Sequence, residues 1–550
     1  MSTPTATEFI EVQLKELEAL IKRAQHEPLS AEESGLLLDL ARSYVHLTEM
    51  LKDKSTTIAR LRKLLFGPQS EKLKDVFADD GDPPVAADGE DATDGGEPME
   101  KEQPPKRRKG HGRNGAAAYP GAQRIGVSHA TLHTGACCPK CLKGKLHPLA
   151  PSRFVRVTGG APLQATVWEL EKLRCGNCGE VFTAASPPGI GEEKYDAAAK
   201  SMIALLKYGT GLPFNRLERL QQDLRIPLPA STQWDLVAEL AEQVEPVYRQ
   251  LISEAAQGKV VHNDDTSMTI LELTGKRLEK RAADGEQLPE RTGVFTSGIV
   301  STADGANIAL YFTGVNHAGE NLEQLLTQRK RELAPPIQMC DALSRNMSPD
   351  FEAIVANCLA HGRRKFVDVA HSFPAECRHV LEALGKVYEN DAKAREQQLS
   401  PEQRLRFHQS ESGSLMNELH QWMAEQFEQR KVEPNSGLGQ AIRYMQNHWP
   451  KLTLFLRVPG APLDNNICER ALKKAILHRK NALFYKTQNG ARVGDLFMSL
   501  IQTCHLAGTS AFEYLTELQK HVRDVARDPP RWLPWNYKAA LDAAAEASES

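Results

Sequence analysis

Lys259-Val260-Val261-His262-Asn263-Asp264-Asp265 is the stretch of this 550-residue chain that decides its fold class and its chemistry. The β-branched run predicts a short strand over 259–262, and two adjacent acidic residues follow that strand directly. Neighbouring residues of an extended chain point to opposite faces, so only one of the two acids is expected to face a site. Asp264 is the preferred candidate, and Asp265 remains the alternative.

The pattern after this stretch predicts a mixed α/β sheet domain. Strands and helices are recognised here by the spacing of their apolar residues and by the Gly-rich or charged segments between them. Asp341 directly follows the last expected strand, just as Asp264 follows the first. Two strands, a helix and a final strand are expected, in that order, over 292–302, 307–313, 318–333 and 337–340.

Helical periodicity dominates the segment from Asn357 to Trp449, which indicates an all-helical insertion. The sheet domain is therefore expected in two parts, 251–356 and 456–505, with the insertion at 357–455 between them. The remaining chain, 506–550, contains a Pro- and Trp-rich run and is expected to be an irregular wrap with a frayed Ala-rich end.

A third acid, Glu469, lies three residues after Asn466, where Asp464 or an asparagine is expected to cap a helix that carries the glutamate inward. Asp264, Asp341 and Glu469 would repel one another strongly unless cations lay between them. Hard oxygen ligands select Mg²⁺, or Mn²⁺, as those cations. Two such ions about 4 Å apart would support an in-line phosphoryl displacement. Composition alone does not select this trio from 71 acidic residues.

Two CxxC pairs, Cys138 with Cys141 and Cys175 with Cys178, predict a separate metal module. Two such pairs close a tetrahedral four-sulfur site with no open position, which is typical of structural Zn²⁺. Short strand-like runs around the pairs favour a zinc ribbon over 119–190. A redox dithiol is the competing interpretation, and Cys137 beside the first pair leaves open which thiolate binds.

Composition excludes several classes of protein. Ten cysteines in 550 residues are too few for a disulfide scaffold, and no run of about 18 apolar residues predicts a membrane span. We therefore expect a multidomain cytoplasmic protein without a membrane partner. The net charge is −3, but ten acids and one base lie between Asp79 and Gln103, so the rest of the chain is net positive.

The amino-terminal third is expected to be modular. Residues 1–78 favour helix, with leucines at heptad spacing that suit either a coiled coil for self-association or a helical hairpin. Residues 79–118 are expected to be an acidic disordered linker. It ends in a basic arm that would follow DNA phosphates or enter a minor groove, or would be a solvated segment. The basic residues of this arm are Lys106, Arg107, Arg108 and Arg113.

Residues 191–250 have helical periodicity that is interrupted by Ile226-Pro227-Leu228-Pro229. One helix is expected to end near Leu224, and a second to begin near Ser231 or Thr232. This arrangement resembles a helix-turn-helix, although two helices joined by a short turn also occur as ordinary packing.

Several separated motifs resemble, in the same order, those of the insertion sequence 66 family transposases. The likeness includes the CxxC pairs and covers most of the chain. Where that family commonly has Asp-Glu at the first motif this chain has Asp264-Asp265, and Leu359 and Ala482 replace usual tryptophans. The motifs are His262-Asn263-Asp264-Asp265-Thr266, Asp341, Cys358-Leu359-Ala360-His361-Gly362-Arg363-Arg364-Lys365-Phe366, Asp464-Asn465-Asn466 through Glu469-Arg470-Ala471-Leu472, and Arg479-Lys480-Asn481-Ala482-Leu483-Phe484.

The resemblance implies a ribonuclease H-like catalytic domain interrupted by the helical insertion, with Asp264, Asp341 and Glu469 as its catalytic acids. It also implies small accessory proteins encoded beside the transposase. His361 would position a phosphate or donate a proton near the site, or be a core histidine. A path for DNA phosphates would be lined by the basic residues Arg363, Arg364, Lys365, Arg470, Lys473, Lys474, Arg479 and Lys480.

We therefore expect a DNA transposase that binds the terminal repeats of its element, cleaves them with Mg²⁺, and joins the 3′ ends to target DNA. Because joining two ends needs at least two active sites, self-association on DNA is expected. Two alternatives remain open. One is a ribonuclease H-like nuclease without strand transfer, and the other is a non-catalytic zinc-dependent DNA-binding regulator.

Overall fold

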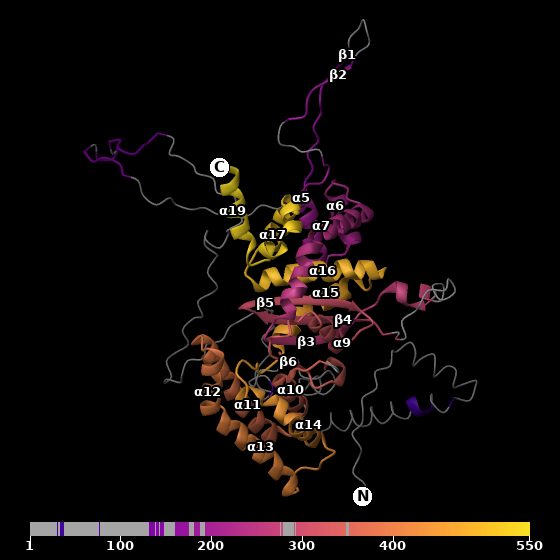
Figure 1. Cartoon of the computed structure of the whole chain (residues 1–550), viewed down its shortest axis with the longest axis vertical. Coiled ribbons are helices and arrows are strands. Elements are labelled where there is room, and N and C mark those ends of the chain that lie inside the picture. The colour runs from indigo at the N-terminus through magenta and orange to yellow at the C-terminus, as the bar shows by residue number, and fades with distance from the viewer. Residues whose placement is uncertain are drawn as a thin grey trace. The chain divides into compact units, whose positions relative to one another are not determined.

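A computed structural model describes most of the chain from residue 193 onward (Figure 1). The chain divides into two compact units, and the larger includes Ala165–Ser550. The predicted coiled coil, the basic arm, and Cys138, Cys175 and Cys178 lie outside the described residues. The described residues are 30, 34–37, 76, 131–137, 139–141, 143–147, 160–174, 181–187, 193–275, 277–278, 291, 293–347 and 351–549.

A five-stranded mixed sheet forms the centre of the larger unit, in the order β5-β4-β3-β6-β7. The first three of these strands pair antiparallel, while β6 pairs parallel with both β3 and β7. The expected mixed α/β sheet is confirmed. The strands are β3 Val260–Ser267, β4 Phe295–Ala303, β5 Ala306–Gly314, β6 Ile337–Cys340 and β7 Ile354–Asn357.

Three details of the predicted sheet domain were wrong. Asp264 does not follow the first strand but lies inside it, because antiparallel pairing with β4 continues as far as Ser267 opposite Phe295. The strand β7 was not predicted, since its four residues lie against the start of a helical segment. The helix expected over 318–333 ends earlier, at Leu326.

Helices from before, within and after this sheet in sequence pack on both of its faces. In α9, His317 forms the N-cap and its backbone N–H donates to the Glu320 carboxylate, a capping box that fixes where the helix begins. The helices around the sheet are α7 Ala230–Ala256, α9 Ala318–Leu326, α15 Asn466–Ala482 and α16 Gln488–Leu506, with short turns η3 Leu271–Leu273 and η4 Ser344–Asn346.

One face of the sheet is covered by α15. Asp264, Gly298 and Tyr311 are cross-strand partners, so their side-chain positions share this face. The Tyr311 hydroxyl donates to the Ala471 carbonyl of α15 at 2.6 Å. A Cβ added to Gly298 would lie 2.8 Å from the Cγ of Leu472, also in α15. Glycine at this position therefore lets α15 approach the sheet directly opposite Asp264.

The other face of the sheet is covered by α9 and α7. Asp265 pairs with Ser297, whose hydroxyl accepts a hydrogen bond from Asn321 of α9 at 2.8 Å. Ser301, on the same face, donates to the Ala255 carbonyl of α7 at 2.6 Å. The two adjacent acids of β3 therefore belong to different faces, packed against different helices.

Five helices separate β7 from α15, and Figure 1 shows them gathered as a bundle next to β6. Their shared core includes Phe366, Leu384, Met423 and Ile442. The chain enters and leaves the bundle at neighbouring residues, because the Leu359 N–H donates to the Leu463 carbonyl at 2.9 Å. Its helices are α10 Leu359–Val369, α11 Pro374–Glu396, α12 Pro401–Glu411, α13 Gly413–Glu428 and α14 Gly437–Leu452, followed by η5 Leu454–Leu456.

The helices before the sheet include two that are joined by the predicted Pro-containing turn. Gln233 fixes this turn, since its buried side-chain amide donates to the carbonyls of Phe214 and Leu228, both at 3.0 Å. The four elements in this region are α5 Ala197–Ala204, η2 Leu205–Gly209, α6 Phe214–Asp223 and the long α7.

The carboxy-terminal segment is more ordered than the predicted irregular wrap. Tyr514, Leu515 and Leu518 of α17 are fully buried, and the helix packs against α5. The apolar periodicity of this helix is what allows it to pack there. The segment contains α17 Ala511–Lys520, α18 Val522–Arg527, η6 Pro529–Trp532 and α19 Tyr537–Glu549.

Near the predicted zinc ligands the structure describes two short antiparallel pairings. Cys137 pairs with Lys145 around the first CxxC pair, and β1 Lys172–Arg174 pairs with β2 Val181–Thr183 around the second. Cys141 is exposed. Among the described residues, none of the helices has the length and apolar content that crossing a bilayer would require.

Candidate functional site

Two acids that were predicted from sequence converge where the parallel pairing of β3 and β6 ends. His262 of β3 is in register with Met339 of β6, and Asp264 and Asp341 each lie two residues further along. The side-chain amide of Asn346 donates to both carboxylates, at 3.2 Å to Oδ1 of Asp264 and 2.7 Å to Oδ1 of Asp341. The two acids therefore share one hydrogen-bond donor.

Asn346 is held in this position by a buried polar network beneath the acids. Its backbone carbonyl accepts hydrogen bonds from Asn263 and Gln338, both at 2.7 Å. Gln338 also donates to the Asn263 side chain at 3.0 Å, and all three residues are buried. Hydrogen bonds among buried side chains of this kind fix side-chain orientation. The sequence analysis missed Asn346, because no motif marks it.

The electrostatics of the site oppose the ionisation of Asp264. Burial, followed by the charges of Asp341, Asp265 and Glu469, raises the pKa of Asp264 to about 7. A carboxylate that is disfavoured by neighbouring carboxylates gains most from a bound cation. The donor set consists of carboxylate oxygens, which are the ligands that Mg²⁺ prefers, and so the residues present fit this ion.

Asp265 has different partners on the opposite face of the sheet. Its side chain is 1% exposed; one carboxylate oxygen lies 2.8 Å from Nδ1 of His317, and the other forms an ion pair with Arg345 at 3.3 Å. Of the two adjacent acids, Asp264 is therefore the one that lies with Asp341, while Asp265 anchors the start of α9.

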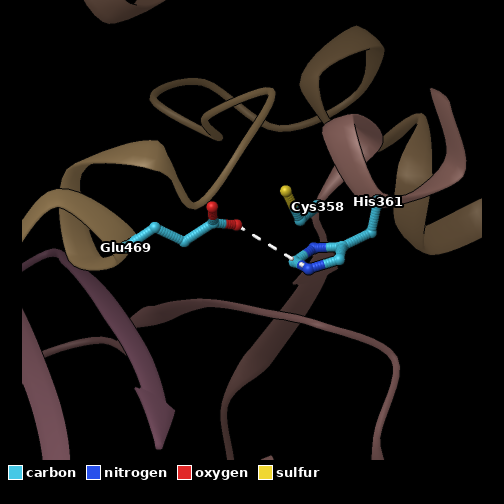
Figure 2. Close-up of side chains that lie close together, drawn as sticks. All are labelled: Cys358, His361 and Glu469. Atoms are coloured by element: carbon cyan, nitrogen blue, oxygen red, sulfur yellow. Dashed lines mark ion pairs between the residues drawn. The ribbon is translucent and has the colours of Figure 1, made fainter. Parts of the chain in front are cut away.

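Glu469 lies in the first turn of α15, the helix that covers the Asp264 face. As expected, Asp464 supports the start of this helix, since its Oδ1 accepts the Asn466 N–H at 3.1 Å. One oxygen of Glu469 lies 3.7 Å from Nε2 of His361. Figure 2 shows Glu469, His361 and Cys358 pointing toward one another, the last two from the start of α10. Burial raises the pKa of the Cys358 thiol to about 12.

Asn465 connects β3, α10 and α15. Its side-chain oxygen lies 3.1 Å from Nδ1 of His262, and its side-chain nitrogen donates to the Asn263 carbonyl at 3.1 Å. Its backbone N–H donates to Sγ of Cys358 at 3.3 Å. Burial lowers the pKa of His262 to about 4, so this imidazole is neutral at physiological pH. Asn465 was among the residues expected to cap α15, and it is the N-cap residue of that helix, whereas no role was predicted for Cys358.

The basic residues predicted to contact DNA differ in their environment. Arg470, Lys473 and Lys480 are exposed on α15. Arg479, in contrast, donates to the Thr266 hydroxyl and to Ser267, which ties α15 to the end of β3.

The other predicted DNA-contacting residues of the insertion and of α15 are less available. Lys365 is exposed and lies over the Tyr444 ring at 5.6 Å, while Arg363 and Arg364 are half-buried. Lys474 is partly buried, and burial lowers its pKa to about 8. Lys106, Arg107, Arg108 and Arg113 lie outside the described residues.

A mixed sheet with two carboxylates brought together on adjacent strands, faced by a helix that carries a further glutamate, defines an α/β protein with a clustered acidic site. The chain belongs to the transposase IS66 family, whose model matches residues 194–493, more than half of its length. It is also similar to uncharacterized protein y4jD of Sinorhizobium fredii, 24% identical over 521 residues that cover 90% of this chain and 96% of the relative. Uncharacterized protein y4hP of the same organism is 25% identical over 394 residues, 68% of each chain.

Proposed function

We propose that this protein is a DNA transposase that binds the terminal repeats of its element, cleaves them, and joins the 3′ ends to target DNA. The observation that carries the proposal is the shared hydrogen bond from Asn346 to Asp264 and Asp341, on the face covered by the Glu469 helix. Three carboxylates from distant parts of the sequence would in this way hold divalent cations. Membership of the transposase IS66 family supports the same conclusion.

In this mechanism Asp264, Asp341 and Glu469 would hold Mg²⁺ or Mn²⁺. Such ions would activate the attacking oxygen and stabilise the leaving oxygen at a phosphodiester. The protein's own groups orient the acids: Asn346 fixes the first two, and Asn465 fixes the start of the glutamate helix. Exposed cations of α15, Arg470 and Lys473, would neutralise DNA phosphates beside the site.

Other parts of the proposal concern the whole assembly. The order of strands in the five-stranded sheet, β5-β4-β3-β6-β7, supports the ribonuclease H-like core that the family resemblance implies. The two CxxC pairs would bind a structural Zn²⁺, and the helices of 1–78 would bring two active sites together on DNA. Small accessory proteins encoded by the element are further proposed partners.

A strand-transfer assay with pre-cleaved terminal-repeat DNA tests this function. The wild type should join the 3′ ends to target DNA in Mg²⁺, and Asp341→Ala should abolish joining while DNA binding persists. Asp524→Asn, an exposed acid in α18, is the matched control and should retain full activity. Cleavage without joining would indicate a nuclease instead. Binding of the ends with neither reaction in the wild type would indicate a non-catalytic regulator.

A further inference from the structure

The side chains of Cys358, His361 and Glu469 form a second cluster beside the acidic site, and their ligand atoms all lie within 4.8 Å of one another (Figure 2). We propose that this cluster is a binding site for a zinc-class cation. Occupancy of that site would withdraw Glu469 from the Mg²⁺ ligand set, so that the cation acts as an inhibitor. The inhibitory consequence rests on the proposed transposase function, whereas the binding itself does not.

Unsatisfied polar atoms are the first support for a bound cation. Oε1 of Glu469 and Nδ1 of His361 are both buried, and neither has a hydrogen-bond partner among the described residues. Oε1 faces Nε2 of His361 across 3.7 Å, which is too long for a hydrogen bond. Buried polar atoms without partners cost free energy, and a cation between these two groups would satisfy the carboxylate oxygen.

The spacing of the ligands supports an ion of zinc's size. Zinc binds imidazole nitrogen and carboxylate oxygen at about 2.0–2.2 Å, which places two such ligands of a tetrahedral ion roughly 3.3–3.6 Å apart. The observed 3.7 Å between His361 and Glu469 needs little adjustment to reach that spacing. Three protein ligands would leave the fourth position to solvent.

The sulfur decides which class of cation is bound. Cys358 is the N-cap residue of α10 and receives the backbone N–H of Asn465 at 3.3 Å, a hydrogen bond that would favour a thiolate. One sulfur, one imidazole nitrogen and one carboxylate suit Zn²⁺ or Co²⁺, whereas Mg²⁺ avoids sulfur. Binding forms a metal–sulfur bond and releases the thiol proton to solvent, with no change of oxidation state.

Inhibition follows because Glu469 is shared between two ligand sets. Glu469 lies in the first turn of α15, and its neighbour Cys468 donates to the Gly298 carbonyl, directly opposite Asp264. On its other side, Oε1 of Glu469 faces Nε2 of His361. A carboxylate bound tightly to a zinc-class ion on one side is less available to Mg²⁺ on the other. The cluster would therefore link transposition to the supply of thiophilic metal.

Cobalt absorption tests the binding site without any measure of activity. The full-length protein is purified with one equivalent of Zn²⁺ per chain, so that the four-cysteine site is filled and the three-ligand site is left open. It is then titrated with Co²⁺, and the thiolate-to-cobalt charge-transfer band is recorded. We expect the wild type and Cys377→Ala, a matched buried cysteine in α11, to gain this band. Cys358→Ala should lose the band, and His361→Gln should weaken Co²⁺ binding by roughly ten- to a hundred-fold.

Equal cobalt spectra for the wild type, Cys358→Ala and His361→Gln would overturn the proposal, whatever the protein's activity. His361 is partly exposed, so its variant remains informative should Cys358→Ala fail to fold. If the binding site is confirmed, Zn²⁺ added to the strand-transfer assay should inhibit the wild type and Cys377→Ala but spare Cys358→Ala. If the wild type binds Co²⁺ at this cluster but shows no strand transfer, the proposed function is refuted and the metal site is not.

Discussion

The side-chain amide of Asn346 donates a hydrogen bond to the carboxylate of Asp341 over 2.7 Å. The residue pair spans one short turn, η4, which follows β6 directly. Because the same amide also reaches Asp264, it holds two like charges close together while offering each a donor. The turn after β6 is thus as much a part of the acidic site as the strands that carry the acids.

Replacing Asn346 by leucine should weaken Mg²⁺ binding, because the carboxylates lose the donor that orients them. Loss of such an orienting group typically costs about 10- to 100-fold in metal affinity or activity. Strand transfer measured against Mg²⁺ concentration should show a higher requirement for the ion. Asn489→Leu, at an exposed position in α16, is the control. An unchanged Mg²⁺ requirement in Asn346→Leu would contradict the role given to this amide.

Asp264→Asn and Asp265→Asn should have opposite effects on metal-dependent stability. Ions that bind the folded state raise its melting temperature, and Asp264 is the acid beside Asp341. Mg²⁺ should therefore raise the melting temperature of the wild type and of Asp265→Asn but not of Asp264→Asn. Without metal, Asp265→Asn should melt lower than the wild type, because its ion pairs with His317 and Arg345 are weakened. The reverse pattern would identify Asp265 as the ligand.

Gly298→Ala should displace the helix that carries Glu469. The added methyl group would meet the Leu472 side chain at 2.8 Å, so that side chain, or α15 with it, must shift opposite Asp264. We expect a large loss of strand transfer, since displacements near 1 Å at a catalytic group cost up to about 100-fold. Gly314→Ala is the matched control, because its added methyl group would meet nothing within 4 Å. Equal strand transfer by the two variants would show that activity does not require close packing of α15 on the sheet.

Arg470→Ala and Lys473→Ala should weaken DNA binding at all sequences. Each phosphate contact that is removed lowers the slope of log affinity against log salt by roughly 1. Fluorescence anisotropy at several salt concentrations would measure this slope. Lys538→Ala, an exposed lysine of α19, should leave the slope unchanged. If affinity falls only for DNA that carries the terminal-repeat sequence, these residues contact bases instead of phosphates.

Asp495 should make folding stability depend on pH. Burial raises its pKa to about 7, although its carboxylate accepts hydrogen bonds from the Thr313 N–H and hydroxyl. The folded state therefore keeps a proton that the unfolded chain releases near pH 4. Stability should fall as pH rises from about 4 to 7, by at most about 1.4 kcal/mol per pH unit. The melting temperature of Asp495→Asn minus that of the wild type should increase as pH rises from about 4 to 7. A difference that stays constant with pH would contradict this prediction.

Much of the sheet was predictable because its strands are short β-branched or apolar runs that end in polar residues. The bounds of β6 agree with the prediction, whereas β3 extends through its own acids. Strand pairing with β4 holds those polar residues extended, and pairing is a tertiary effect that the local pattern does not contain. The four-residue β7 was missed for the same reason.

At the candidate site, the sequence identified the acids but not the groups that arrange them. Asp264 and Asp341 were found because each lies at or near a strand end and within a family motif. Asn346 lies in a short turn with no periodic pattern, and its role depends on bonds to Asn263 and Gln338 from neighbouring strands. Gly298 is likewise ordinary in sequence, and its importance follows only from the packing of α15.

The five-helix bundle leaves the sheet and returns to it at a single hydrogen-bonded junction, between Leu359 and Leu463. A segment whose two ends already touch places little constraint on the length of what lies between them. Evolution can therefore enlarge, shorten or exchange this segment without moving the acids. The same junction offers a place to graft a foreign domain onto this protein.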